Sequence, residues 1–206
     1  MGYSIAWLSI AGPDPRESLH ELGLAVTGES ERFPRSRYYG RMQANGRYLL
    51  VASGCDDPIA GASTLATFSR DRDVVAGIVE EHVMYFRTEE WRDGRRLWHV
   101  EHDCQQNREH LVAAGELPEQ YAEIRDRLVA EQAAENEDAE DEFEAGDVLG
   151  NVPLDVAALR SGFHYEDPEH GLDGWGKHVY DVVGPMAVPL PPAAKRDDAK
   201  PWWKLW

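Results

Sequence analysis

The sequence predicts a single α+β domain with a mainly antiparallel sheet and helices packed on it, and three observations support this fold class. The 206 residues are 42% hydrophobic, which is enough to bury one ordinary core. Two strand-like segments flank the turn "RDG" and predict a long β-hairpin over about residues 74–103. The predicted elements follow the order β-α-β-α-β-β-α-α, which is typical of an α+β domain.

The N-terminal part contributes two strands and a capped helix. "YSIAWLSI" (3–10) is apolar on both faces, as expected of a buried strand. A helix is predicted in "GPDPRESLHELG", because Asp14 can cap its start and Gly23 can end it. Residues 27–46 are polar and turn-rich, and the next strand is predicted over 47–53.

The hairpin pattern predicts which side chains share a face. One long strand over 73–91 is expected to turn through a three-residue loop at 92–94. That register leaves Glu89 on a mostly polar face. A two-residue Asp93-Gly94 turn would place Trp98 opposite Glu89, so it is not favoured. The favoured register collects four apolar side chains on one buried face: Met84, Phe86, Trp98 and Val100.

The C-terminal half combines two predicted helices with two unusual segments. "LPEQYAEIRDRLVAEQAAE" and "VPLDVAALRSGF" have helical spacing or helix-end signals, and a mobile acidic loop over about 131–147 is predicted between them. "KHVYDVV" fits an edge strand that closes the domain, which is predicted to cover residues 1–183. Residues 184–206 contain five prolines and three tryptophans, and they predict a stiff linker with an aromatic tail.

Charge is the most unusual property of the chain. The 38 acidic residues against 21 basic ones give a formal net charge of −17, and residues 131–144 hold eight carboxylates and no base. Such an excess repels nucleic acid and anionic membranes, and it favours a cationic partner. There is no leader pattern, no apolar run of about 18 residues and no disulfide framework, so a cytoplasmic protein without a membrane span is expected.

The acidic loop and the tryptophan tail are the predicted partner-binding regions. The loop is expected to steer a basic protein partner, while anchors on the folded domain are sought among aromatics such as Tyr85, Trp91 and Trp175. The tail is expected to dock on protein, either on its own domain or on a second subunit of a homo-oligomer, rather than on a membrane. The predicted binding residues are Glu135, Glu137, Asp138, Glu140, Asp141, Glu142, Trp202, Trp203 and Trp206.

Residues with candidate chemistry are few. His82 and His102 are predicted to approach Cys104 at the end of the hairpin, which is a zinc-like ligand set without a fourth member. Packing at a strand end explains these residues without a metal, and no CxxC or HExxH spacing supports one, so no metal is expected. Asp56 and Asp57 follow a strand, but an Asp-Asp-Pro turn accounts for them. No phosphate-binding glycine motif, GxSxG or HExxH occurs, and therefore no catalytic residue and no cofactor is predicted.

The pieces "MGYSIAWLSI", "VVAGIVEEHVMYF", "EEWRDGRRLWHVEHD" and "LPEQYAEIRDRL" resemble a group of small acidic bacterial proteins without assigned activity. This resemblance covers most of residues 1–165. It implies an α+β fold and a bacterial cytosolic origin, and it brings no catalytic residues. In size, acidity and the lack of a reaction motif, the chain also resembles immunity proteins that neutralise secreted bacterial toxins, in type rather than in motif.

Two classes of function stay open at this point. The favoured class is a non-enzymatic binding protein, in its sharpest form an immunity-type inhibitor of a basic toxin. The alternative is a metal-assisted or Cys/His-dependent hydrolase with its site at the end of the hairpin.

Overall fold

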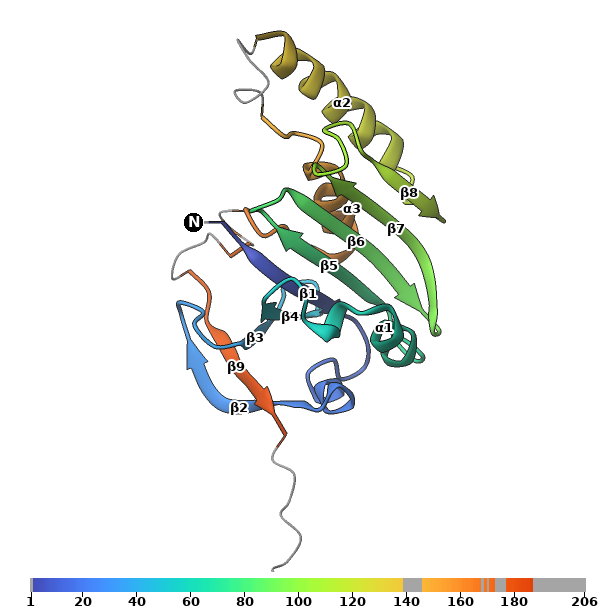
Figure 1. Ribbon diagram of the computed structural model, residues 1–206. Helices are drawn as coiled ribbons and strands as arrows, with labels where there is room; N and C mark the ends of the chain where they lie inside the picture. The colour runs from blue at the N-terminus through green and yellow to red at the C-terminus, as the bar shows by residue number, and fades with distance from the viewer. Residues whose placement is uncertain (1, 139–145, 168, 170, 173–176, 187–206) are drawn as a thin grey trace, which may run out of the picture.

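The computed structural model describes residues 2–138, 146–167, 169, 171–172 and 177–186. Within these ranges the strands are β1 (Ser4–Ile10), β2 (Leu24–Glu31), β3 (Tyr38–Met42), β4 (Tyr48–Ser53), β5 (Val74–Glu80), β6 (Tyr85–Arg92), β7 (Arg95–Asp103), β8 (Val112–Gly115) and β9 (Tyr180–Pro185). They form one antiparallel sheet in the order β2-β9-β3-β4-β1-β5-β6-β7-β8 (Figure 1). The predicted α+β class with a mainly antiparallel sheet is confirmed.

Helices cover both faces of this sheet. The α-helices are α1 (Ala62–Phe68), α2 (Tyr121–Asp138) and α3 (Asn151–Ser161), and the 3-10 helices are η1 (Glu17–Leu22) and η2 (Pro58–Ala60). On one face α3 packs across β5, β6 and β7 and contacts α2, whereas η1, η2 and α1 cover the other face (Figure 1). In the part of the chain that the structure describes, no helix combines the length and the apolar composition needed to cross a membrane.

β1 lies in the interior of the sheet between β4 and β5, and its alternate side chains enter two separate cores. Ile5 and Trp7 face the core under α2 and α3, whereas Leu8 faces the core under the other helices. Burial on both faces explains why this segment is apolar at nearly every position. On β5, a Cβ at Gly77 would lie 2.4 Å from ring atoms of Trp7, so only glycine leaves room for the indole.

The predicted single strand over 73–91 is wrong, because the chain reverses between β5 and β6. Val79 pairs with Phe86, and Glu80 pairs with Tyr85. A strand of that length would extend about 60 Å at roughly 3.3 Å per residue, far beyond any neighbour that could pair with it. Reversing after Glu80 lets β5 pair with β1 and β6 pair with β5. The region is therefore a three-stranded meander, β5-β6-β7, and not one long hairpin.

The turn between β6 and β7 also differs from the predicted three-residue loop. Asp93 and Gly94 both have positive φ, 52° and 73°, as in a two-residue type I′ turn. A β-bulge then skips Leu97, so that Glu90 pairs with Trp98. The pairing is displaced by two residues from the predicted one, and strand faces alternate with a period of two. The predicted buried set therefore survives, with Phe86, Trp98 and Val100 in the core and Met84 partly buried against it.

Glu89 is not on an open polar face. Its residue exposure is 2%, and its carboxylate lies 3.3 Å from the Arg87 guanidinium and 3.4 Å from that of Arg96. Arg87 also donates to the carbonyl of Ala60 in η2 at 3.1 Å. The face predicted to be polar is thus covered as well, and Glu89 is a buried ion-pair partner.

Three further boundaries differ from the sequence predictions. β2 and β3 occupy half of the region 27–46 that the pattern predicts to be turn-rich, and β9 lies between them rather than at an edge. β9 runs to Pro185, two residues past the predicted domain end. Residues 131–138 are helical because α2 continues through them, whereas residues 139–145 of the predicted acidic loop lie outside the described ranges.

Candidate functional site

A cluster of His102, Cys104 and Asp147 lies where the end of β7 meets the segment that leads into α3. Potential ligand atoms of the three side chains all lie within 4.8 Å of one another. His102 is fully buried, since it shares its strand face with Trp98 and Val100. Its Nδ1 lies 2.7 Å from the carbonyl oxygen of His110, and its Nε2 lies 2.9 Å from Oδ2 of Asp147.

Gln132 of α2 positions the backbone around Asp147. The Gln132 side chain is buried, and its Nε2 donates to the carbonyl of Gly146 at 2.7 Å. Its Oε1 accepts from the backbone N–H of Val148 at 2.8 Å and of Leu149 at 3.4 Å. One amide therefore holds the chain on both sides of Asp147, and this directs the carboxylate toward β7.

The Asp147 side chain is 5% exposed, and its two oxygens differ. Oδ2 contacts His102, whereas Oδ1 is buried and has no hydrogen-bond partner among the residues that the structure describes. Buried polar atoms are nearly always paired with protein, water or an ion. Oδ1 of Asp147 can therefore accept from water or bind an ion.

The sulfur of Cys104 is in an environment that favours the thiol. Burial raises the pKa of the Cys104 thiol, the nearby Asp147 carboxylate raises it further, and Arg108 opposes them. Since the thiolate is the reactive form, a raised pKa makes Cys104 a weak nucleophile. The Cys-dependent form of the hydrolase hypothesis is thereby disfavoured.

The structure brings two of the three sequence-predicted residues of this site together, and it separates the third. His82 is exposed on the turn after β5, where its Nδ1 lies 2.6 Å from Oε1 of Glu80. Its predicted approach to Cys104 depended on the long strand that the chain does not form. Sequence reasoning missed Asp147, which lies 45 residues after His102. The one sequence feature that marks Asp147 is its position: it is the last carboxylate of the acidic segment and directly precedes the apolar "VLG".

Asp56 and Asp57 have the structural role that the turn interpretation predicts. Asp57 is buried and caps η2, accepting from the backbone N–H of Ile59 at 3.1 Å. Its other oxygen accepts from the Arg37 guanidinium at 3.0 Å and from the Tyr38 hydroxyl at 2.8 Å. Asp56 is exposed. The buried carboxylate is thus fully occupied in holding the loop after β4.

The predicted partner-binding carboxylates divide between α2 and the residues outside the described ranges. Glu135 and Glu137 are exposed near the end of α2, and Asp138 is its last residue. Glu140, Asp141 and Glu142 lie outside the described residues, as do Trp202, Trp203 and Trp206.

The side of α2 that faces away from the domain is acidic. Leu128 and Gln132 are buried, and at about 100° per residue the opposite side of the helix carries Glu123, Asp126 and Glu137. These three side chains are exposed. We call them the α2 acidic face.

The aromatic anchors expected beside such carboxylates are not free. Trp91 is 7% exposed and belongs to the core under α1. Tyr85 is half-buried, and its hydroxyl donates to Glu101 at 3.1 Å. Trp175 lies outside the described residues. The prediction that Trp91 is an exposed anchor is therefore wrong, since the alternation of β6 points Trp91 to the face of the sheet that α1 covers.

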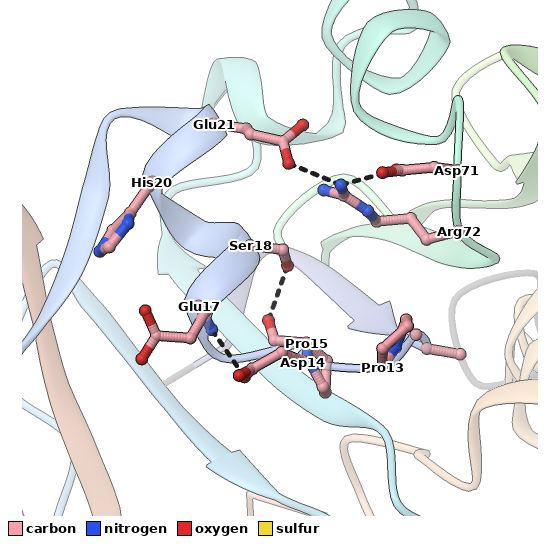
Figure 2. Close-up of a pocket in the computed structure, with 11 residues that line it drawn as sticks. Pro13, Asp14, Pro15, Glu17, Ser18, His20, Glu21, Asp71 and Arg72 are labelled. Atoms are coloured by element: carbon pink, nitrogen blue, oxygen red, sulfur yellow. Dashed lines mark hydrogen bonds and ion pairs between the residues drawn. The ribbon is translucent and has the colours of Figure 1, made fainter.

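A separate pocket of about 380 Å³ lies beside η1 (Figure 2). The buried Arg72 guanidinium in its wall lies 2.6 Å from both Glu21 and Asp71, and it stacks over the Phe68 ring at 4.5 Å. The carboxylates that line the pocket are Asp14, Glu17, Glu21 and Asp71. With one arginine against four carboxylates, this lining disfavours phosphate and carboxylate ligands and suits a cationic group.

Comparison with known proteins identifies no relative: no family model matches the chain, and neither a curated protein nor a solved structure is significantly similar to it.

Proposed function

We propose that this protein is a non-enzymatic binding protein for a basic protein partner, which the α2 acidic face and the acidic segment after it attract. One observation carries the proposal: the side of α2 opposite to the buried Leu128 and Gln132 carries exposed carboxylates, in a chain with a net charge of −17. Complementary charge accelerates the association of two proteins and selects the partner.

Neighbouring arginines offset only a small part of the local negative charge. Between residues 116 and 147 the sequence holds thirteen carboxylates and two arginines. Arg125 pairs with Asp126 at 2.7 Å, and Arg127 pairs with Asp155 of α3 at 2.7 Å. Both cations are thus already paired with carboxylates.

The sharpest form of this proposal is an immunity-type inhibitor of a basic toxin enzyme in a bacterium. Such an inhibitor works in the cytoplasm of the cell that it protects. The two cysteines, Cys55 and Cys104, are free thiols, which fits a reducing compartment.

A charge-neutralising variant tests the proposal. The full chain captures its partner from extracts of the source cell, and association and dissociation rates are then measured against salt concentration. We expect the triple variant Glu123→Gln, Asp126→Asn, Glu137→Gln to associate about tenfold more slowly at low salt, with a flatter salt dependence and a nearly unchanged dissociation rate.

The matched control is Glu29→Gln, Asp56→Asn, Asp93→Asn, which removes the same charge from exposed positions away from α2 and from the pocket beside η1. This control should lose much less of the association rate. Equal losses in the two triple variants would show that net charge acts alone, and the α2 acidic face would then have no special role.

A metal-assisted hydrolase is the second candidate, and the His102–Cys104–Asp147 cluster favours it. Three protein ligands with a fourth position left for water are the pattern of catalytic zinc sites. Hydrolysis of nitrophenyl esters and phosphates by the zinc-loaded chain, lost on Asp147→Asn, would support this candidate over the binding protein.

A further inference from the structure

We propose that His102, Cys104 and Asp147 form a binding site for one zinc-like divalent ion, with Nε2 of His102, Sγ of Cys104 and the Asp147 carboxylate as ligands. Imidazole nitrogen, cysteine sulfur and carboxylate oxygen together are a donor set that Zn²⁺ accepts. Cys104 binds the ion as a thiolate, so metal binding releases the proton that the metal-free site favours on its sulfur. The inference is independent of partner binding, because it concerns other residues and another chemistry.

The hydrogen bonds of His102 require something between its Nε2 and Asp147. A carbonyl oxygen only accepts, so the contact with His110 places a proton on Nδ1 of His102. In the neutral ring Nε2 then directs a lone pair at Oδ2 of Asp147, 2.9 Å away, which is also an acceptor. Either a second proton or a metal ion must lie there. Metal-bound histidines commonly donate their other N–H to a carbonyl in this way.

The remaining contacts favour the metal over the second proton. A proton on Nε2 of His102 would give Oδ2 of Asp147 a hydrogen bond, but the buried Oδ1 would still have no partner among the residues that the structure describes. A metal ion can be bound by both oxygens of the Asp147 carboxylate. It would also account for the presence of the Cys104 sulfur in the same cluster. The cluster is also pre-positioned, since His102 is locked in the core and Gln132 holds the backbone on both sides of Asp147.

The distances need only small adjustments. Around a tetrahedral zinc ion with bonds of about 2.0–2.3 Å, ligand atoms lie about 3.3–3.7 Å apart. The 2.9 Å contact between Nε2 and Oδ2 would open by a few tenths of an ångström, and pairs near the 4.8 Å limit would close by about 1 Å. Rotation of the half-buried Cys104 and of the Asp147 carboxylate supplies these shifts.

The fourth position is left to water. His110 is the nearest further imidazole, with its ring centroid 6.5 Å from that of His102. Its Nδ1 accepts from the backbone N–H of Asp103 at 2.9 Å, which places its proton on Nε2. In this tautomer His110 has no free lone pair to give to the metal.

Cobalt titration of the chelator-stripped full chain tests the site, because Co²⁺ reports its ligands by absorption. We expect one equivalent of Co²⁺ per chain, a sulfur-to-cobalt charge-transfer band, and displacement by Zn²⁺. Cys104→Ser should abolish the band. Asp147→Asn should weaken binding by at least about tenfold, since even the loss of an outer hydrogen-bond partner costs that much. Cys55→Ser, the matched control, should keep both the band and the affinity.

Amide exchange supplies a readout that does not depend on absorption. Zn²⁺ should slow exchange at residues 146–149 in the parent chain and leave it unchanged in Cys104→Ser, with circular dichroism confirming that each variant is folded. Binding that is substoichiometric, or a charge-transfer band that survives Cys104→Ser, would overturn the metal site and leave an ion pair of His102 and Asp147. Neither outcome would affect the test of partner binding.

Discussion

Glu80, at the end of β5, connects three segments of the chain through its carboxylate. Its carboxylate accepts from the Ser4 hydroxyl at 2.6 Å and from the Cys55 thiol at 3.2 Å, and it lies 2.6 Å from Nδ1 of His82. The Ser4 hydrogen bond, followed by those of His82 and Cys55, lowers the pKa of Glu80 to about 2. The ionised form is therefore favoured in the folded protein.

This pKa predicts a loss of stability in acid. The folded pKa of Glu80 lies below the unfolded value of about 4.3, so its contribution is complete above about pH 5 and is lost as the pH falls toward about 2. We expect Glu80→Gln to flatten this part of the curve of melting temperature against pH. Glu29→Gln removes the same charge at an exposed position, and it should leave the curve nearly as steep as in the parent chain.

The side chains around the β6–β7 bulge predict a second residue-scale result. Trp98 is 2% exposed and donates from Nε1 to Glu90 at 2.8 Å, so Trp98→Ala should lower the free energy of unfolding by about 3–5 kcal/mol. Glu89→Ala should cost about 1–3 kcal/mol, because it leaves Arg87 and Arg96 without their buried partner. Denaturant midpoints measure both. Arg95→Ala, at an exposed position, should stay within about 0.5 kcal/mol.

At the scale of elements, Gln132 joins α2 to the segment that leads into α3. Gln132→Ala would leave the Gly146 carbonyl and the Val148 N–H without this partner, and we expect it to cost about 1–3 kcal/mol. Glu131→Ala, which changes an exposed neighbour in the same helix turn, should change stability by less than about 0.5 kcal/mol. Thermal unfolding of the two variants separates them, and equal costs would show that Gln132 does not hold the segment.

At the scale of the whole molecule, the tail is the region whose function the fold does not explain. Removing residues 201–206 should shift tryptophan emission and reduce self-association in sedimentation experiments, because tryptophan is enriched at protein interfaces. The variant Lys200→Gln, Lys204→Gln keeps the indoles and should keep self-association. Tail-dependent sedimentation with anionic liposomes, lost in this lysine variant, would instead identify a membrane contact.

The sequence by itself determined those features that depend on local patterns. Apolar residues on both faces of 3–10 predict an interior strand, and β1 is one. Gly23 and Gly162 both end helices with positive φ, as their positions in the sequence predict. The buried face of the β6–β7 hairpin was predicted despite a wrong turn, because alternation has a period of two and the loop and bulge errors sum to two.

Only the tertiary structure decided which distant segments meet. The reversal after Glu80, the insertion of β9 between β2 and β3, and the hydrogen bond of Arg87 to η2 beside the buried Glu89 all depend on neighbours far along the chain. The same is true of the candidate metal site. His102 lies near the end of β7 and Cys104 directly follows this strand, so the sequence could bring these two together. Asp147 meets His102 across 45 residues, because Gln132 holds the backbone beside it. Local periodicity specifies which face a side chain occupies, and only long-range packing specifies what lies opposite it.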